Sequence, residues 1–263
     1  MVKFFLLIFA SALLSTKLFF QSLLWKISGS FTEASVAILI NSNDDIFVVT
    51  FASCISLSTD GDVNWAYQPI VAGTIKNAIL TKDESKIILF GYTSDIFGLK
   101  PFIASVDTSN GSLVASTYID SIIMDDFDQF NGFSLVEDTI GNFFTAYKSG
   151  SKMIVMKFDS NLNFVTEKIL PYSGWNDNYQ MLYTKTGKLL LKETENSYSE
   201  EIIRSIDFEN NIFNWILSIP SREDAIFSEG LNNEYFFAGG KKDGIVNPYM
   251  CKVIDHDTSA QLI

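Results

Sequence analysis

The feature that most constrains this fold is a turn motif that returns about every fifty residues. The residues that open it are Ser58, Asp107, Asp159, Asp207 and Asp255, with spacings of 49, 52, 48 and 48 residues. An alternating apolar run precedes each of them, and polar or small residues follow. Asp, Asn and Gly favour the backbone conformations of tight hairpin turns. The motif therefore predicts one β-hairpin in each of five units.

A second series of turns lies upstream in each unit. It reads NSNDDIFVV, TKDESKIILF, EDTIGNFFTA, TKTGKLLLK and LNNEYFFAG. One unit is therefore a four-stranded antiparallel meander whose middle connection varies in length. A single sheet of this kind cannot bury both of its faces, so neighbouring units must stack on it. The sequence predicts an all-β protein, a β-propeller of about five four-stranded antiparallel blades that spans residues 25–263.

The two ends of the repeat leave the closure of the ring open. The stretch SLLWKIS around Trp25 is typical of a lone fourth strand placed before the first unit. The fifth unit has its own candidate fourth strand, SAQLI at residues 259–263. The chain is therefore either a five-bladed ring with two competing closing strands or an incomplete piece of a larger propeller.

Several of these segments resemble the bacterial-type secreted β-propeller repeat. In that family a turn with Gly leads to a Ser-Thr-Tyr strand, an Asp-containing approach and an Asp-x-x-Gly-Asn hairpin. The matching positions are Asn110, Gly111, Ser116, Thr117, Tyr118, Asp126, Gly141 and Asn142, with Gly91, Tyr92 and Thr93 for a Gly-Tyr-Thr strand end. Trp25, Trp65 and Trp215 are similar to the Trp that ends units in quinoprotein-like propellers. The resemblance implies extracellular binding or scaffolding and no catalytic residues.

The N-terminus has the pattern of a signal peptide over residues 1–16. A positive start at Lys3 is followed by a short apolar run, and Ala10 and Ala12 fit the small-x-small cleavage pattern. The alternative is an uncleaved membrane anchor from Phe4 to Leu24, which Lys17 makes only marginally favourable. We expect a secreted protein or one in the lumen of the secretory pathway, with membrane attachment only through an uncleaved N-terminal segment.

The charge balance argues against nucleic acid as a partner. The chain carries 31 Asp and Glu against 19 Lys and Arg, a net charge of −12. Affinity for nucleic acid comes mainly from Lys and Arg that neutralise phosphates. The partners left open are an unidentified protein or glycan ligand.

No residue pattern indicates catalysis, a metal or a cofactor. The single histidine, His256, lies in a predicted turn and has no nucleophile motif around it. The acidic cluster of Asp125, Asp126 and Asp128 lacks the alternating calcium pattern, because Phe130 stands where the third ligand belongs. The first prediction is a non-catalytic interaction or scaffold module. The alternative is a propeller enzyme, a quinone-dependent oxidoreductase or a glycosidase with a channel or inter-blade acidic site.

Four asparagines are candidates for smaller roles. Asn77, Asn131 and Asn178 fall near the start of the predicted first strands of units two, three and four, which line the central channel of a propeller. Amides there either bind a ligand or ordered water or satisfy backbone groups. Asn110 opens NGS, the only Asn-x-Ser/Thr acceptor in the chain, and predicts a glycosylation site.

The two cysteines are predicted to stay unpaired within the chain. Cys54 and Cys251 each lie four residues before a turn-opening residue, so they occupy equivalent third strands of the first and fifth units. Equivalent positions on packed sheets are about 10 Å apart. A disulfide needs Cα atoms within roughly 7 Å.

Overall fold

A computed structural model describes most of the repeat region. The described residues are 35–68, 73–95, 98–119, 133–149, 152–171, 179–194, 200–210, 212–220, 226–229, 234–242, 246–255 and 260–262. Every helix or strand element within these ranges is a β-strand. Among the same residues, no helix has the length and hydrophobicity needed to cross a bilayer.

Twenty strands in the described ranges form five antiparallel sheets of four strands, each in chain order. The first sheet holds β1 (Ser35–Ile40), β2 (Ile46–Thr50), β3 (Cys54–Leu57) and β4 (Val63–Tyr67). The second holds β5 (Gly73–Leu80), β6 (Lys86–Asp95), β7 (Gly98–Asp107) and β8 (Leu113–Tyr118). The third holds β9 (Phe133–Glu137), β10 (Phe143–Ser149), β11 (Lys152–Phe158) and β12 (Phe164–Pro171). The fourth holds β13 (Tyr179–Tyr183), β14 (Leu189–Thr194), β15 (Glu200–Asp207) and β16 (Ile212–Pro220). The fifth holds β17 (Ile226–Glu229), β18 (Glu234–Lys242), β19 (Val246–Asp255) and β20 (Ala260–Leu262).

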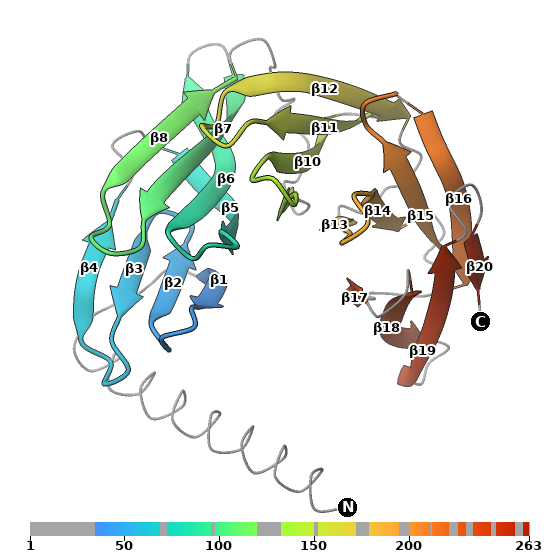
Figure 1. Cartoon of the computed structure of the whole chain (residues 1–263), viewed down its shortest axis with the longest axis horizontal. Helices are drawn as coiled ribbons and strands as arrows, with labels where there is room; N and C mark the ends of the chain where they lie inside the picture. Colours follow the sequence, from blue (N-terminus) through green and yellow to red (C-terminus); the bar gives the residue numbers. More distant parts are fainter. Residues whose placement is uncertain are drawn as a thin grey trace, which may run out of the picture.

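The five sheets stand side by side in an arc, with the first strand of each sheet on the inside (Figure 1). Consecutive sheets pack through these inner strands, β1 on β5, β5 on β9, β9 on β13 and β13 on β17. In the described part of the chain, no strand pair joins the first sheet to the fifth in this way. The predicted propeller of five four-stranded blades is confirmed, and β20 supplies the fifth sheet's own fourth strand. The predicted strand around Trp25 lies outside the described residues.

The hydrophobic core is divided into layers between consecutive sheets. Alternate residues of β6 serve two of them, since Ile87 and Leu89 face the first sheet and Ile88 and Phe90 face the third. A strand that is buried on both faces reads as a continuous apolar run. This explains why β6 begins KIILF rather than with strict alternation.

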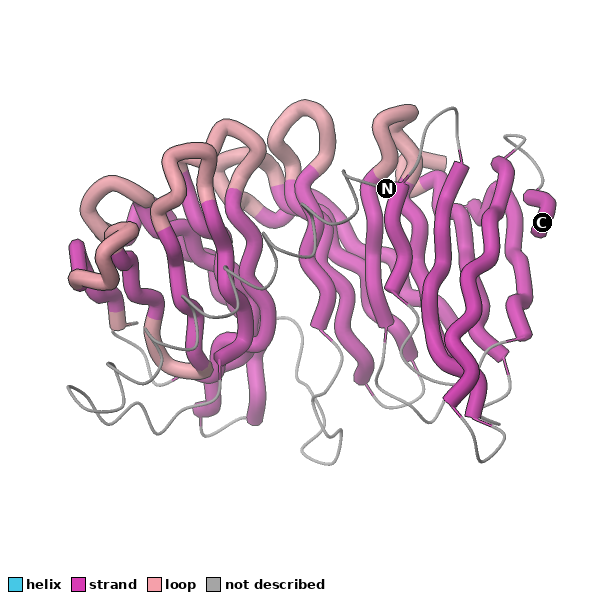
Figure 2. Tube along the Cα trace, turned by 90° about the horizontal axis from the view of Figure 1, so that it is seen from below, coloured by secondary structure: helices cyan, strands magenta, loops and turns pink. Residues whose placement is uncertain are grey.

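The tight turns share one design and lie along one edge of the arc (Figure 2). We call this edge the turn face; it comprises residues 41–45, 58–62, 81–85, 107–112, 138–142, 159–163, 184–188 and 207–210. In most of these turns a polar side chain at the first position accepts a backbone N–H further along, as Asp138 does from Ile140 and Asn142. The fourth residue is often left-handed, which suits Gly141 (φ 86°) and is unusual for Leu162 (φ 64°).

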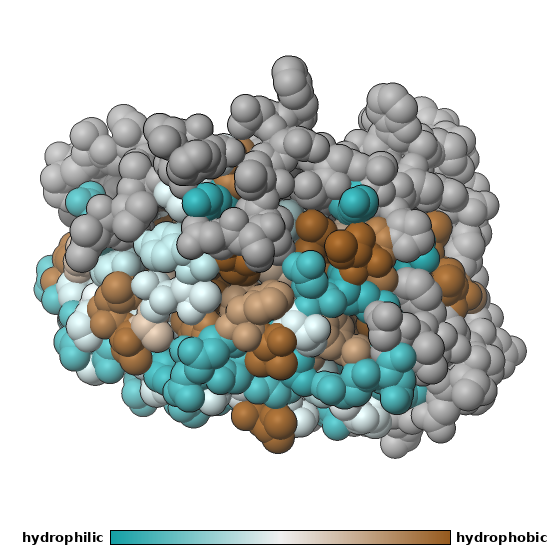
Figure 3. Space-filling model, turned by 90° about the horizontal axis from the view of Figure 1, so that it is seen from above, coloured by the Kyte–Doolittle hydropathy of each residue, from teal (hydrophilic) through white to brown (hydrophobic). Residues whose placement is uncertain are grey.

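The outermost strands carry a bulge at equivalent places in the first four sheets, and the register shifts beside Leu57, Val106, Phe158 and Ile206. Bulges twist an edge strand and hinder pairing with another chain. Apolar side chains of these strands are exposed, and Figure 3 shows such residues scattered among hydrophilic ones on this side.

Candidate functional site

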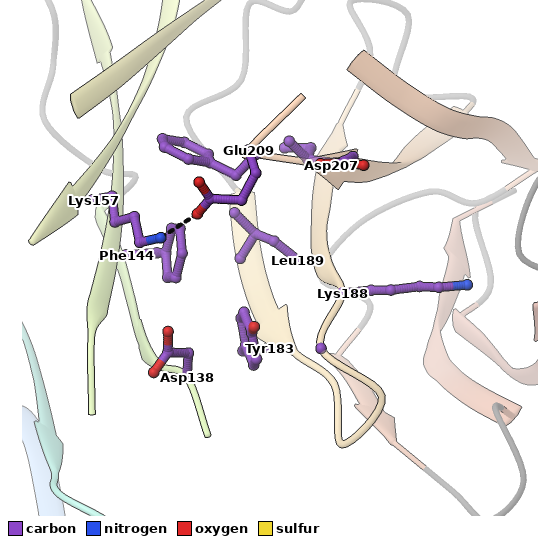
Figure 4. Close-up of a pocket in the computed structure, with 11 residues that line it drawn as sticks. Asp138, Phe144, Lys157, Tyr183, Lys188, Leu189, Asp207 and Glu209 are labelled. Carbon is purple, nitrogen blue, oxygen red and sulfur yellow. Dashed lines mark hydrogen bonds and ion pairs between the residues drawn. The ribbon is translucent and has the colours of Figure 1, made fainter. Parts of the chain in front are cut away.

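A pocket of about 270 Å³ opens at the turn face between the third and fourth sheets. The residues that line it come from β10, β11, β13, β14, β15 and the turns beside them (Figure 4). They are Asp138, Phe144, Lys157, Tyr183, Gly187, Lys188, Leu189, Ile206, Asp207, Phe208 and Glu209. The repeat places one turn of the third sheet (138–142) beside two turns of the fourth (184–188 and 207–210), and the pocket lies between them.

Three aromatic rings form one wall of the pocket. The rings of Phe144 and Tyr183 are stacked with centroids 5.6 Å apart, and Phe208 meets Phe144 edge-on at 5.2 Å. The ammonium of Lys157 lies 5.6 Å from the Phe144 centroid, in cation–π range. Phe144 is therefore in contact on several sides and belongs to the core layer, while Tyr183 is half-buried.

The cation of this wall has a counter-ion from the other sheet. Lys157 of β11 donates to a carboxylate oxygen of Glu209, which follows β15 (Figure 4). The Lys157 side chain is 15% exposed and that of Glu209 is 76% exposed. Salt bridges with an exposed partner contribute little to stability, about 0–1 kcal/mol. The ion pair therefore borders one side of the pocket but adds little to its stability.

The carboxylates of the two pocket aspartates accept hydrogen bonds within their own turns. Asp138 accepts hydrogen bonds from the backbone N–H of Ile140 and Asn142 and from the Asn142 amide. Asp207 accepts from the backbone and the side chain of Asn210. The Asn210 hydrogen bonds are the main reason that the pKa of Asp207 lies below its usual value. Its carboxylate is therefore ionised throughout the physiological range.

The hydroxyl of Tyr183 is a polar group of the pocket without a hydrogen-bond partner among the described residues. Burial raises the pKa of Tyr183, and the nearby carboxylates of Asp138 and Glu209 raise it further. The hydroxyl stays protonated at neutral pH and is available as a donor and an acceptor.

This arrangement suits binding better than proton transfer. A general acid or base works best with a pKa near the operating pH. The pKa of Asp207 is instead lowered, further from neutral pH. The carboxylate of Glu209 is paired with Lys157. Among the described residues, no group of three or more His, Cys, Asp or Glu is placed to hold a metal ion.

The residues predicted from the sequence do not meet in this pocket. Asn77 lies in the middle of β5, half-buried and beside a bulge. Asn110 is exposed in the β7–β8 turn, where its side-chain oxygen accepts the backbone N–H of Ser112. Asn131 and Asn178 lie outside the described residues, as do His256 and the cluster of Asp125, Asp126 and Asp128. The functional predictions for these residues stay predictions.

The cysteines occupy the expected strands, β3 and β19. Cys54 is a free, fully buried thiol that packs in the layer between the first and second sheets. That layer faces away from the fifth sheet, which lies at the other end of the arc (Figure 1). Cys251 lies in β19, and its side chain is outside the described set.

The pocket was not predicted from the sequence, although a signal was present. Asp138 opens a turn of the upstream series and Asp207 a turn of the first series. An aromatic residue follows each of them, Phe144 and Phe208. Only the packing of the third sheet on the fourth shows that these two turns face one pocket.

Comparisons with known proteins support the fold. No protein-family model matches the chain, and a search of curated proteins gives no significant match. A protein of unknown function from Bacteroides caccae is similar in structure, with a TM-score of 0.60 and 11% identity over 88% of this chain and 81% of that one. Hydrazine synthase from Kuenenia stuttgartiensis gives 0.62 and 8% identity over 89% and 67%. The WD40 domain of Neurospora crassa Pan2 gives 0.57 and 14% identity over 88% and 66%.

These likenesses define the class of protein. WD40 domains are β-propellers. The chain is therefore a β-propeller protein, built from five of the four-stranded sheets that this architecture repeats. At these identities the likeness shows the fold and leaves the activity open.

Proposed function

We propose that this protein is a non-catalytic interaction module that binds a ligand at the turn face and releases it unchanged. The observation that carries the proposal is the state of the pocket's acids. Asp138 and Asp207 accept the N–H groups of their own turns, and Glu209 pairs with Lys157. What the pocket offers a ligand is a half-buried Tyr183 hydroxyl beside stacked rings.

The proposed setting is the secretory pathway or the cell exterior, with an unidentified protein or glycan as ligand. The apolar N-terminus with its small-x-small pattern supports a cleaved signal peptide. The resemblance to the secreted propeller repeat supports the same compartment. In a eukaryotic host, Asn110 would then carry a glycan, since its turn is exposed. A mass decrease after glycosidase treatment of secreted protein is expected, and an unchanged mass contradicts this part.

The role without catalysis is tested by measuring turnover directly. Purified protein is incubated with chromogenic glycosides, and separately with a quinone cofactor, an alcohol and a redox dye. We expect rates equal to those of the buffer. A rate above background that falls in E209Q or Y183F would show that the pocket is an active site and would overturn the proposal.

A further inference from the structure

A lysine on the inner side of the arc lies apart from the pocket. Lys76 belongs to β5, the innermost strand of the second sheet (Figure 1). It is the extra residue of a bulge between Ile75 and Asn77. The equivalent bulge in β1 holds Val36. Bulges often redirect a side chain, and here the second sheet uses one to place a cation where the first sheet has a valine.

Two aromatic rings from different sheets flank the Lys76 ammonium. Its nitrogen lies 5.2 Å from the ring centroid of Phe51 and 5.6 Å from that of Tyr92. Phe51 follows β2, is 38% exposed, and is held in place because its carbonyl accepts the backbone N–H of Ile75 at 2.7 Å. The cation and the rings are thus positioned by backbone structure of both sheets.

Lys76 has no counter-ion among the described residues. Other lysines of the chain do, since Lys157 pairs with Glu209 and Lys252 with Glu234. Partial burial lowers the pKa of Lys76, and no neighbouring charge contributes to the shift. An ammonium that is positioned by two rings and has no carboxylate beside it among the described residues can pair with an anionic group.

We propose that Lys76, Phe51 and Tyr92 bind the carboxylate of an acidic saccharide. The ammonium pairs with the carboxylate, and the exposed part of the Phe51 ring contacts the apolar C–H face of the sugar. Binding sites of this kind combine aromatic walls with a few placed polar groups. The inference deepens the proposed interaction function and rests on it, but it concerns a site separate from the pocket at the turn face.

The probe is trigalacturonate, titrated calorimetrically into the full chain, with neutral maltotriose and triaspartate as comparisons. We expect binding of trigalacturonate that weakens with added salt, because one ion pair carries it. K76Q should weaken binding about tenfold, the usual scale of a lost charged hydrogen bond. K76R should retain most of it, since the charge and the cation–π contact remain.

Matched variants separate the site from general charge and fold effects. K152Q removes an exposed lysine of β11 and should leave the affinity within about twofold. F51L, which keeps an apolar side chain but removes the ring, should weaken trigalacturonate binding, whereas maltotriose, which has no carboxylate, should bind neither the wild type nor F51L measurably. The thermal stability of each variant is measured first, and if K76Q fails to fold, the loss of binding expected in F51L carries the test.

Three outcomes overturn the inference. They are no binding of trigalacturonate by the wild type, equal binding by K76Q, and triaspartate binding that is as tight as trigalacturonate and indifferent to F51L. Turnover of the glycosides described above would instead overturn the proposed function, whatever K76Q does to binding.

Discussion

At the scale of single residues, Cys54 shows how burial controls chemistry. The thiol is fully buried, and desolvation raises its pKa to about 12. Because the thiolate is the reactive form, we expect no reaction of Cys54 with a disulfide reagent at pH 8 in the native protein. Peptide mapping after labelling with and without denaturant measures this. Rapid native labelling of Cys54 would contradict the packing between the first two sheets.

Gly91 occupies a place in β6 that no larger residue fits. A Cβ atom there would lie 2.1 Å from the carbonyl oxygen of Thr74 in β5. G91A must push two backbones apart, and we expect it to destabilise the fold by about 1–3 kcal/mol or more. G73A is the comparison, since its nearest contacts are at 3.1 Å and one is a side chain. Urea unfolding should rank G91A well below G73A; equal stabilities would count against the described register.

Asp159 opens the turn after β11 and links stability to pH. Hydrogen bonds from the Asn163 side chain, then from backbone N–H groups, hold its pKa below the usual value of 3.8. A depressed folded pKa adds stability above the unfolded pKa, and this is lost as pH falls through the folded value. D159A should therefore be less stable than wild type at pH 7, with a smaller difference at pH 3. A difference that is constant with pH, or one equal to that of the exposed control D62A, would refute this role.

At the scale of elements, neighbouring sheets are joined by contacts between turns and strands. The Trp65 indole in β4 donates to the carbonyl of Thr108 in the next sheet at 2.8 Å. The same ring lies against Gly111, where a Cβ would come within 2.6 Å of it. Trp65, in the last strand of the first unit, thus connects the first sheet to the second by a hydrogen bond and by packing.

The contact between the two sheets is tested by W65F, which removes the indole N–H and keeps an aromatic ring. W65F loses one hydrogen bond and part of the packing, and should cost about 1–3 kcal/mol. The conservative control is V63T in the same strand, since Val63 is 59% exposed. A W65F protein as stable as V63T, measured by urea unfolding, would show that the contact between these two sheets does not depend on Trp65.

The elements were predictable from the sequence to the extent that local chemistry determines them. Turn-opening residues such as Asp138 and Asp159 bind their own backbone, so their spacing predicts the hairpins without knowledge of the packing. The bulge that carries Lys76 and the left-handed Leu162 have no local signal. Phe51 and Lys76 are 25 positions apart on different sheets, and only the stacking of those sheets brings them together.

At the scale of the whole molecule, each sheet depends on its neighbours. The core consists of layers between consecutive sheets, so stability in such a repeat is roughly a sum of sheet and interface terms. The first sheet leaves Ile38 and Ile40 about half exposed, whereas inner-strand residues such as Ile75 of the second sheet are fully buried. We infer that the outer sheets of the arc open more readily than the second and third.

Amide hydrogen exchange, read by peptide mass spectrometry, tests the central claim that five stacked four-stranded sheets make up this protein. The account predicts protection that repeats every fifty residues or so, strongest in the middle strands β6, β7, β10 and β11. Fast exchange should recur in the turns at 58–62, 107–112 and 159–163. Protection that lacks this period, or that is strongest across those turns, would contradict the propeller and with it the two proposed sites.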